Sequence, residues 1–292
     1  MIQYNPKDWL SFIFRFHKSD TFLKLLPMIL LVGAYAGIIA FFEIEYWRWT
    51  EGNKVKNIVV MHSLLGFVIS LLLVFRTNTA YDRWWEGRKL WGALVNNSRN
   101  LALKLSAMLP KSDNTDRLFF KTAIPQYALA LKNHLRSEHT RLELDEKTHP
   151  ELAELDHEKH LPNQLAALLF KKVNSLYESK KITGDQLIIL NSELQSFTDI
   201  CGACERIKNT PIPFSYSTFI KKFIFFYVMT LPWGYVFSLG YLVIPVVAFI
   251  FYVLASLELI AEEIEDPFGT DNNDLPMDKI AANIQKHVGE LL

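Results

Sequence analysis

Two apolar stretches in the first quarter of the chain are long enough to cross a membrane. A bilayer core is spanned by about 20 predominantly apolar residues of helix. Residues 22–42 contain a single charged side chain, Lys24 near their start, and residues 58–75 contain only His62 and two serines as polar side chains. We therefore expect membrane-spanning helices at both places, with His62 bonded to a neighbouring backbone or hydroxyl group.

A third apolar stretch, in the last quarter of the chain, is too long for a single crossing. No charged residue lies between Phe223 and Leu257. Glycine and proline often end or interrupt helices. A turn is therefore expected either at 232–234, where Pro, Trp and Gly follow one another, or at Gly240. The pattern predicts a helical hairpin with spans at 223–239 and 240–257, which makes four spans in all.

The polar stretch between the second and third spans, residues 76–222, is predicted to be helical. Leu, Ala, Lys and Glu recur there at helical spacing, and the period-two pattern of strands is lacking. Helix breaks are expected at polar, Pro or Gly clusters: 110–116, 149–150, 162 and 184. No Gly or Pro lies between Phe67 and Glu86, so the second span should continue as helix beyond the membrane. The expected fold class is all-α.

The charge distribution orients these spans. Lys and Arg accumulate before the first span, after the second and before the third, which by the positive-inside rule places both termini and the middle region in the cytoplasm. The formal net charge is zero, so whole-chain electrostatics does not favour nucleic acid. The predicted organisation is 1–75 (interfacial segment and two spans), 76–222 (cytoplasmic helices), 223–257 (two spans) and 258–292 (cytoplasmic end).

Candidate metal and catalytic motifs are sparse. Cys201 and Cys204 form a C-x-x-C pair, but neither a second such pair nor a βαβ context accompanies it. His157 and His160 would share one helical face, with His149 nearby, and a metal-dependent membrane enzyme using these three is one hypothesis. The surrounding Glu and Lys residues are equally typical of a solvated helix. Without a Walker A, G-x-S-x-G or H-E-x-x-H motif, the sequence predicts that the protein is not an enzyme.

An apolar stripe marks the second span. Phe67, Leu71 and Phe75 are spaced by four residues and therefore align on one helix face. In a membrane helix such a stripe most often means ordinary packing. In a ring of identical subunits it would instead form stacked apolar rings around an axis, and such rings gate an aqueous path by dewetting.

Three stretches of the chain resemble the bestrophin family. They are residues 75–91, 201–213 and 266–276. The first contains Arg83, Trp84 and Trp85, similar to the R-W-W signature that follows the family's second span. The last reads D-P-F-G-T-D-N-N-D, where the family has N-P-F-G-x-D-x-x-D, and the middle one is similar to bacterial members in particular.

This resemblance implies a homopentamer around one axial pore for small monovalent ions, in the inner membrane of a bacterium. Counted back from the R-W-W signature, the implied neck residues are Phe67, Leu71 and Phe75. A cytoplasmic constriction is also implied. Its local candidates are Leu187, Ile188 and Ile189. The family's best-known members pass chloride, whereas some bacterial relatives pass cations, so the sign of the permeant ion stays open.

Eukaryotic members bind calcium near the acidic segment after the fourth span. The matching positions here are Glu263, Asp266, Asp271 and Asp274. Oxygen ligands suit calcium. However, Asn272 and Asn273 reduce the number of acidic residues in this segment, and the bacterial members of the family look calcium-independent. We therefore expect no cofactor, with calcium as the alternative. For function, the alternative to a channel is a non-conducting membrane scaffold or regulatory subunit.

Overall fold

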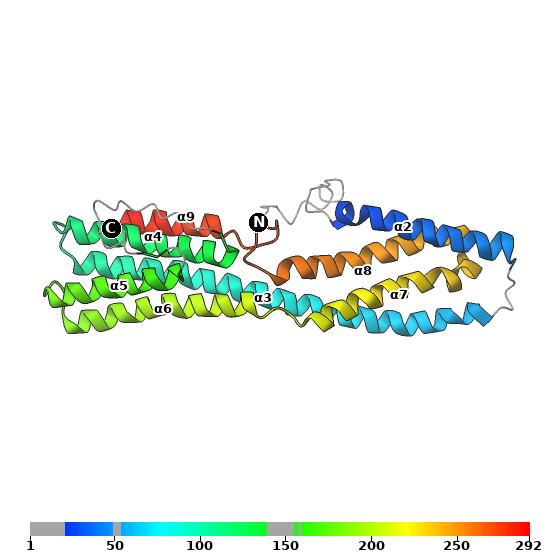
Figure 1. Ribbon diagram of the computed structural model, residues 1–292, viewed down its shortest axis with the longest axis horizontal. Helices are drawn as coiled ribbons and strands as arrows, with labels where there is room; N and C mark the ends of the chain where they lie inside the picture. Colours follow the sequence, from blue (N-terminus) through cyan, green and yellow to red (C-terminus); the bar gives the residue numbers. More distant parts are fainter. Residues whose placement is uncertain (1–20, 49–53, 139–154, 157–158) are drawn as a thin grey trace. The chain divides into compact units, whose positions relative to one another are not determined.

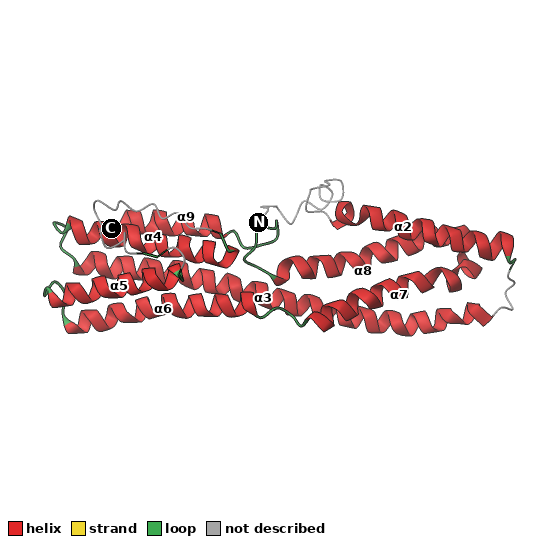
Figure 2. Cartoon of the chain, in the orientation of Figure 1, coloured by secondary structure: helices red, strands yellow, loops and turns green. Residues whose placement is uncertain are grey.

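The computed structural model describes residues 21–48, 54–138, 155–156 and 159–292, and in these ranges it is helical and has no strand (Figure 2). The predicted all-α class is confirmed. The helices are α2 (Thr21–Phe41), α3 (Ile58–Met108), α4 (Asn114–Arg136), α5 (Leu161–Glu178), α6 (Gly184–Asn209), α7 (Phe214–Leu239), α8 (Val243–Glu265) and α9 (Met277–Leu291) (Figure 1). As predicted, α3 continues without a break far beyond the apolar stretch at its start.

The chain divides into two compact units, which we call the apolar unit and the polar unit. The apolar unit holds the described residues up to Arg83 together with Pro211–Glu265, and the polar unit holds Trp84–Thr210 and Asp266–Leu292. Among the described residues, three helical stretches are long and apolar enough to cross a membrane: Thr21–Tyr46, Ile58–Met108 and Phe214–Glu265.

The third of these stretches is a hairpin of α7 and α8. Gly240 ends α7 with a positive φ of 52°, and a short 3₁₀ turn leads into α8. The turn therefore falls at Gly240. Its backbone conformation is accessible to glycine and strained for other residues, which explains why glycine occupies this position. Pro232 and Gly234 lie inside α7, so the alternative turn at 232–234 is wrong.

Side chains from α2, α3, α7 and α8 form the core of the described part of the apolar unit. Val32 of α2, Ile69 of α3, Ile224 of α7 and Val247 of α8 are among its buried members. Helix α2 packs on α8, and α7 packs on α8. The helix α2 ends in a π-helical turn, Phe42–Tyr46.

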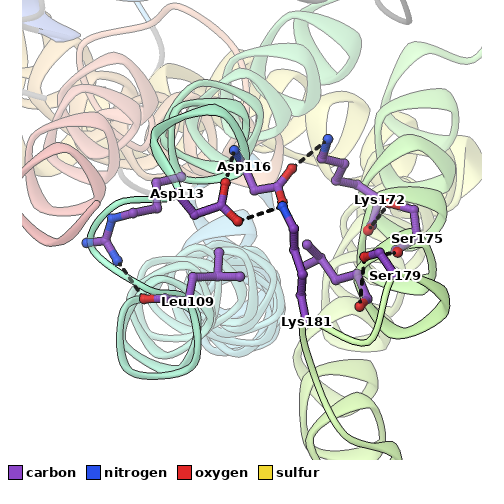
Figure 3. Close-up of polar contacts among 9 residues, drawn as sticks. Leu109, Asp113, Asp116, Lys172, Ser175, Ser179 and Lys181 are labelled. Atoms are coloured by element: carbon purple, nitrogen blue, oxygen red, sulfur yellow. Dashed lines mark hydrogen bonds and ion pairs between the residues drawn. The ribbon is translucent and has the colours of Figure 1, made fainter.

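Helix boundaries in the polar unit follow local capping chemistry. Asp113 caps α4 by accepting a hydrogen bond from the Asp116 N–H (Figure 3), and Thr183 and Gln186 form a capping box at the start of α6. Pro162 lies in the first turn of α5, where its missing N–H costs nothing. The breaks predicted at 110–116, 162 and 184 are confirmed, and the one at 149–150 lies outside the described residues.

Candidate pore-lining site

Helix α3 has two contrasting faces within the apolar unit. His62, Ile69, Leu73 and Arg76 are buried. The face with the predicted stripe is open: Phe67 is 71% exposed, Leu71 46% and Phe75 57%. The predicted residues thus lie together on a face of α3 that the described part of the chain leaves largely exposed.

The exposed stripe extends further toward the start of α3 than the three residues predicted from the sequence. Val60 and Leu64 are 69% and 68% exposed, and they precede Phe67 by seven and three residues. Spacings of three, four and seven keep side chains on one helix face. The spacing of Val60 and Leu64 from Phe67 could have revealed them in the sequence. They were not predicted because aliphatic residues are common throughout an apolar span.

Hydrogen bonds along α7 hold the buried face of α3 in place. His62 Nε2 lies 2.9 Å from Thr230 Oγ1, which confirms the expected hydroxyl partner. The Tyr227 hydroxyl donates to the His62 carbonyl at 3.4 Å, and the Tyr216 hydroxyl donates to the Leu72 carbonyl at the same distance. These contacts fix the rotation of α3 and so determine which of its side chains point outward.

A buried ionic network anchors α3 at its last turns within the apolar unit. Arg76 is 1% exposed; its Nη2 lies 2.8 Å from Glu265, and its Nε lies 3.4 Å from Glu258. Glu265 also accepts the Ile212 N–H at 2.7 Å, and its carbonyl accepts Arg83 Nε at 3.0 Å. Burying an arginine is costly unless it is paired, so this network strongly favours one arrangement of α3 against α8. Arg76 is not among the site residues predicted from the sequence.

The R-W-W signature has structural roles on both sides of the unit boundary. Arg83 belongs to the network of the apolar unit. In the polar unit, Trp84 Nε1 donates to the Asn273 carbonyl at 3.0 Å and its ring stacks on Trp85. The signature therefore ties α3 to the last residue of α8 through Arg83 and to the segment after α8 through Trp84.

The candidates for a cytoplasmic constriction lie in the first turns of α6. Ile188 is 70% exposed and Ile189 is 45% exposed, whereas Leu187 packs against the core of the polar unit. Of the three side chains, those of the two isoleucines are exposed, and a cytoplasmic constriction stays a prediction.

The acidic positions that match the family's calcium-binding segment make local contacts. Asp266 Oδ1 accepts the Phe268 N–H at 3.3 Å, and Asp274 Oδ2 accepts the Asp271 N–H at 2.6 Å. Both bonds stabilise the turn between α8 and α9. Glu263, in the apolar unit, is paired with Lys24. Calcium binding at these positions stays a prediction.

Of the three histidines predicted to form a cluster, His160 lies within the described residues. His149 and His157 lie outside the described residues, and His160 caps α5 and is not within a helix, so the shared helical face is wrong. Instead, His134 Nε2 and His160 Nε2 each lie 2.6 Å from Glu205 Oε1. Burial acts to raise the pKa of Glu205, but the bonds from His160 and His134 prevail and hold that pKa below its usual range.

The C-x-x-C pair is buried within the polar unit. Burial raises the pKa of the Cys201 thiol to about 12 and raises that of Cys204 as well. The thiolate is the reactive and metal-binding form, so this environment favours inert, structural cysteines.

The fold and the exposed stripe define a class: a helical membrane protein whose α3 presents an apolar face outward. Residues 1–290 match the family described as Bacterial/Fungal Bestrophin protein. The chain therefore belongs to the bestrophin family, which is a family of ion channels.

Proteins similar to this chain agree with that assignment. A voltage-dependent anion channel-forming protein of Nostoc sp. is 37% identical over 244 residues, 80% of each chain. The voltage-dependent anion channel-forming protein YneE of Escherichia coli is 32% identical over 286 residues, 98% of this chain and 92% of that protein. The bacterial bestrophin homologue of Klebsiella pneumoniae, a crystal structure phased with zinc, is similar with a TM-score of 0.79 and 27% identity, over 91% of this chain and 98% of that one.

Proposed function

We propose that this chain is one subunit of a homopentameric channel for small monovalent ions, with four membrane spans and a neck formed by Phe67, Leu71 and Phe75. The observation that carries the proposal is the exposure of these three side chains on a helix whose opposite face is fixed by buried bonds. One stripe per chain encloses no path. Five stripes around an axis enclose one and place rings of phenylalanine and leucine along it.

Such a neck controls passage by excluding water when it is narrow. It carries no charge, so it gates without choosing the sign of the ion. The relatives are named as anion channels. In this chain, the sign is set by charges and backbone dipoles elsewhere on the path, and a reversal potential reports it directly. Ile188 and Ile189 are proposed as the second, cytoplasmic constriction.

The proposed topology has both termini and the polar unit in the cytoplasm of a bacterial cell. The uncharged turn at Gly240 joins the third and fourth spans on the opposite side. The Lys and Arg residues that accumulate before the first span, after the second and before the third lie on the cytoplasmic side.

The experiment is a current recording from the purified protein in planar bilayers under a salt gradient. We expect currents whose reversal potential moves toward the equilibrium potential of one ion. Replacing Phe67→Ala or Phe75→Ala widens the neck and should increase conductance. Leu30→Ala, which shortens a 65% exposed side chain on α2, is the matched control and should leave conductance unchanged. A well-behaved oligomer without current in every variant would instead identify a membrane scaffold.

A further inference from the structure

Two side chains from helices of the polar unit and one from a helix N-cap converge on one point. His134 lies in the last turn of α4, His160 is the N-cap of α5, and Glu205 lies near the end of α6. Both imidazole Nε2 atoms lie 2.6 Å from the same carboxylate oxygen, and the two rings are 4.4 Å apart between centroids. Among the described residues, these are the His, Cys, Asp and Glu side chains that gather three ligand atoms closely enough to share a metal ion.

We propose that His134, His160 and Glu205 form a binding site for one divalent transition-metal ion, with Zn²⁺ the best match. Two imidazole nitrogens and one carboxylate oxygen are ligands that zinc prefers, and three protein ligands leave a fourth position for water. Imidazole also selects against Mg²⁺ and Ca²⁺, which take oxygen ligands. Each of the three side chains is about one-third exposed, so an ion reaches the site from solvent.

The hydrogen bonds of His160 specify what metal binding must change. Its Nδ1 accepts the Asn163 N–H at 3.1 Å, so without metal the proton of the neutral ring is on Nε2, where it is donated to Glu205. When the ion takes Nε2, that proton is released and Nδ1 gains one from solvent. A protonated Nδ1 no longer accepts the Asn163 N–H, so the His160 ring must turn away from it, and this N–H in the first turn of α5 bonds to water instead.

The geometry requires only a small adjustment. Metal–ligand bonds of about 2.1 Å in a tetrahedron place neighbouring ligand atoms about 3.4 Å apart. The present separation of each Nε2 from Glu205 Oε1 is 2.6 Å. Each Nε2 must therefore move away from Oε1 by about 0.8 Å. Rotations of three partly exposed side chains achieve this without moving a helix.

A metal here would cross-link the end of α4 to the start of α5 and to α6. His134 and His160 flank the segment between α4 and α5, so the ion would fix both ends of that segment. A ligand that binds only the folded state raises its thermal stability. The site is therefore a stabilising element of the polar unit, and it is independent of whether α3 lines a pore.

The test uses the full-length protein in detergent, with any purification tag removed and metal stripped by a chelator. Zn²⁺ is titrated against a chromogenic zinc chelator. We expect one tightly bound ion per chain, with affinity lowered at least about 100-fold in His134→Gln and in Glu205→Gln, because losing a ligand costs at least as much as losing a supporting bond. His287→Gln removes a histidine of α9 that lies 3.9 Å from Glu290, and it should retain full affinity.

Two further measurements distinguish the other outcomes. The double variant His149→Gln/His157→Gln should keep the full affinity for Zn²⁺. If this double variant lost the affinity while Glu205→Gln kept it, the proposal would be overturned. Wild-type protein loaded with Co²⁺ should show the intense visible absorption of four-coordinate cobalt, which does not depend on whether any variant folds. Only the weak bands of the hydrated ion, or no stoichiometric Zn²⁺ binding by the wild type, would also overturn it.

Discussion

At the scale of single residues, the polar unit contains a cluster of charges that joins three segments (Figure 3). Asp116 is 6% exposed, with Lys172 Nζ at 2.9 Å and Lys181 Nζ at 2.5 Å, and Lys181 also lies 2.6 Å from Asp113. Burial alone would raise the pKa of Asp116, but the bonds from Lys181 and Lys172 outweigh it and lower that pKa. The charged form of Asp116 therefore stabilises the fold.

We predict that Asp116→Asn lowers the free energy of unfolding by about 2 kcal/mol at pH 7, the usual size for hydrogen bonds to a charged group. Because the pKa of Asp116 is lower in the folded state, its contribution is complete above the ordinary aspartate pKa of about 4. It is lost as the pH falls through the folded-state pKa, so the wild type and the variant should converge in strong acid.

Thermal unfolding followed by circular dichroism at several pH values checks this. Asp199→Asn, an exposed position on α6, is the matched control and should change the free energy by less than about 0.5 kcal/mol. An equal loss of stability from Asp116→Asn at every pH would show that its charge is not the cause.

At the scale of elements, the α7–α8 hairpin depends on one backbone conformation. Gly240 has φ 52° and ψ −136°, a region that is strained for residues with a Cβ atom, and a Cβ built there would meet no neighbour within 4 Å. Any cost of substitution at Gly240 thus comes from the backbone and not from crowding.

We predict that Gly240→Ala destabilises the protein by about 1–3 kcal/mol through this strain. The matched comparison is Gly202→Ala, because Gly202 also has open space around its Cβ position but lies inside α6. Alanine is the better helix former, so Gly202→Ala should raise stability by about 1 kcal/mol. Thermal unfolding midpoints of the two variants in the same detergent measure the difference, and two shifts of the same sign would contradict the interpretation.

The elements were largely predictable from local sequence, but their ends and their distant contacts were not. The unbroken α3 and the breaks before α4, α5 and α6 follow from Gly, Pro and capping residues, which act on their immediate neighbours. The apolar limit at Phe223 did not mark the start of α7 at Phe214, because Lys221 and Lys222 end the apolar stretch without ending a helix. The apolar pattern predicts which residues lie in lipid, whereas capping residues predict where a helix begins and ends.

The candidate sites, too, were predictable where they rest on a local sequence pattern and not where they rest on distant contacts. The stripe on α3 was predictable because it repeats within one helix. The cluster of His134, His160 and Glu205 was missed because its members are 71 and 45 residues apart along the chain. Only the packing of α4, α5 and α6 brings them together, and no local pattern encodes that packing.

At the scale of the whole molecule, a single chain leaves much apolar surface for lipid or for other copies of itself. Leu30 of α2 and Phe249 of α8 are exposed, as is the stripe of α3. The proposed channel separates these surfaces: the α3 stripe faces an aqueous path, whereas Leu30 faces lipid or protein. This difference in solvent access can be measured one position at a time.

The most direct measurement is the modification of introduced cysteines by charged methanethiosulfonate reagents during current recording. The native thiols Cys201 and Cys204 are buried, so the background reaction is low. In the proposed channel, Phe67→Cys reacts from the aqueous path and its current changes on modification, whereas the current of Leu30→Cys does not. Currents that stay unchanged in Phe67→Cys, Leu71→Cys and Phe75→Cys alike would contradict the placement of the α3 stripe in the pore.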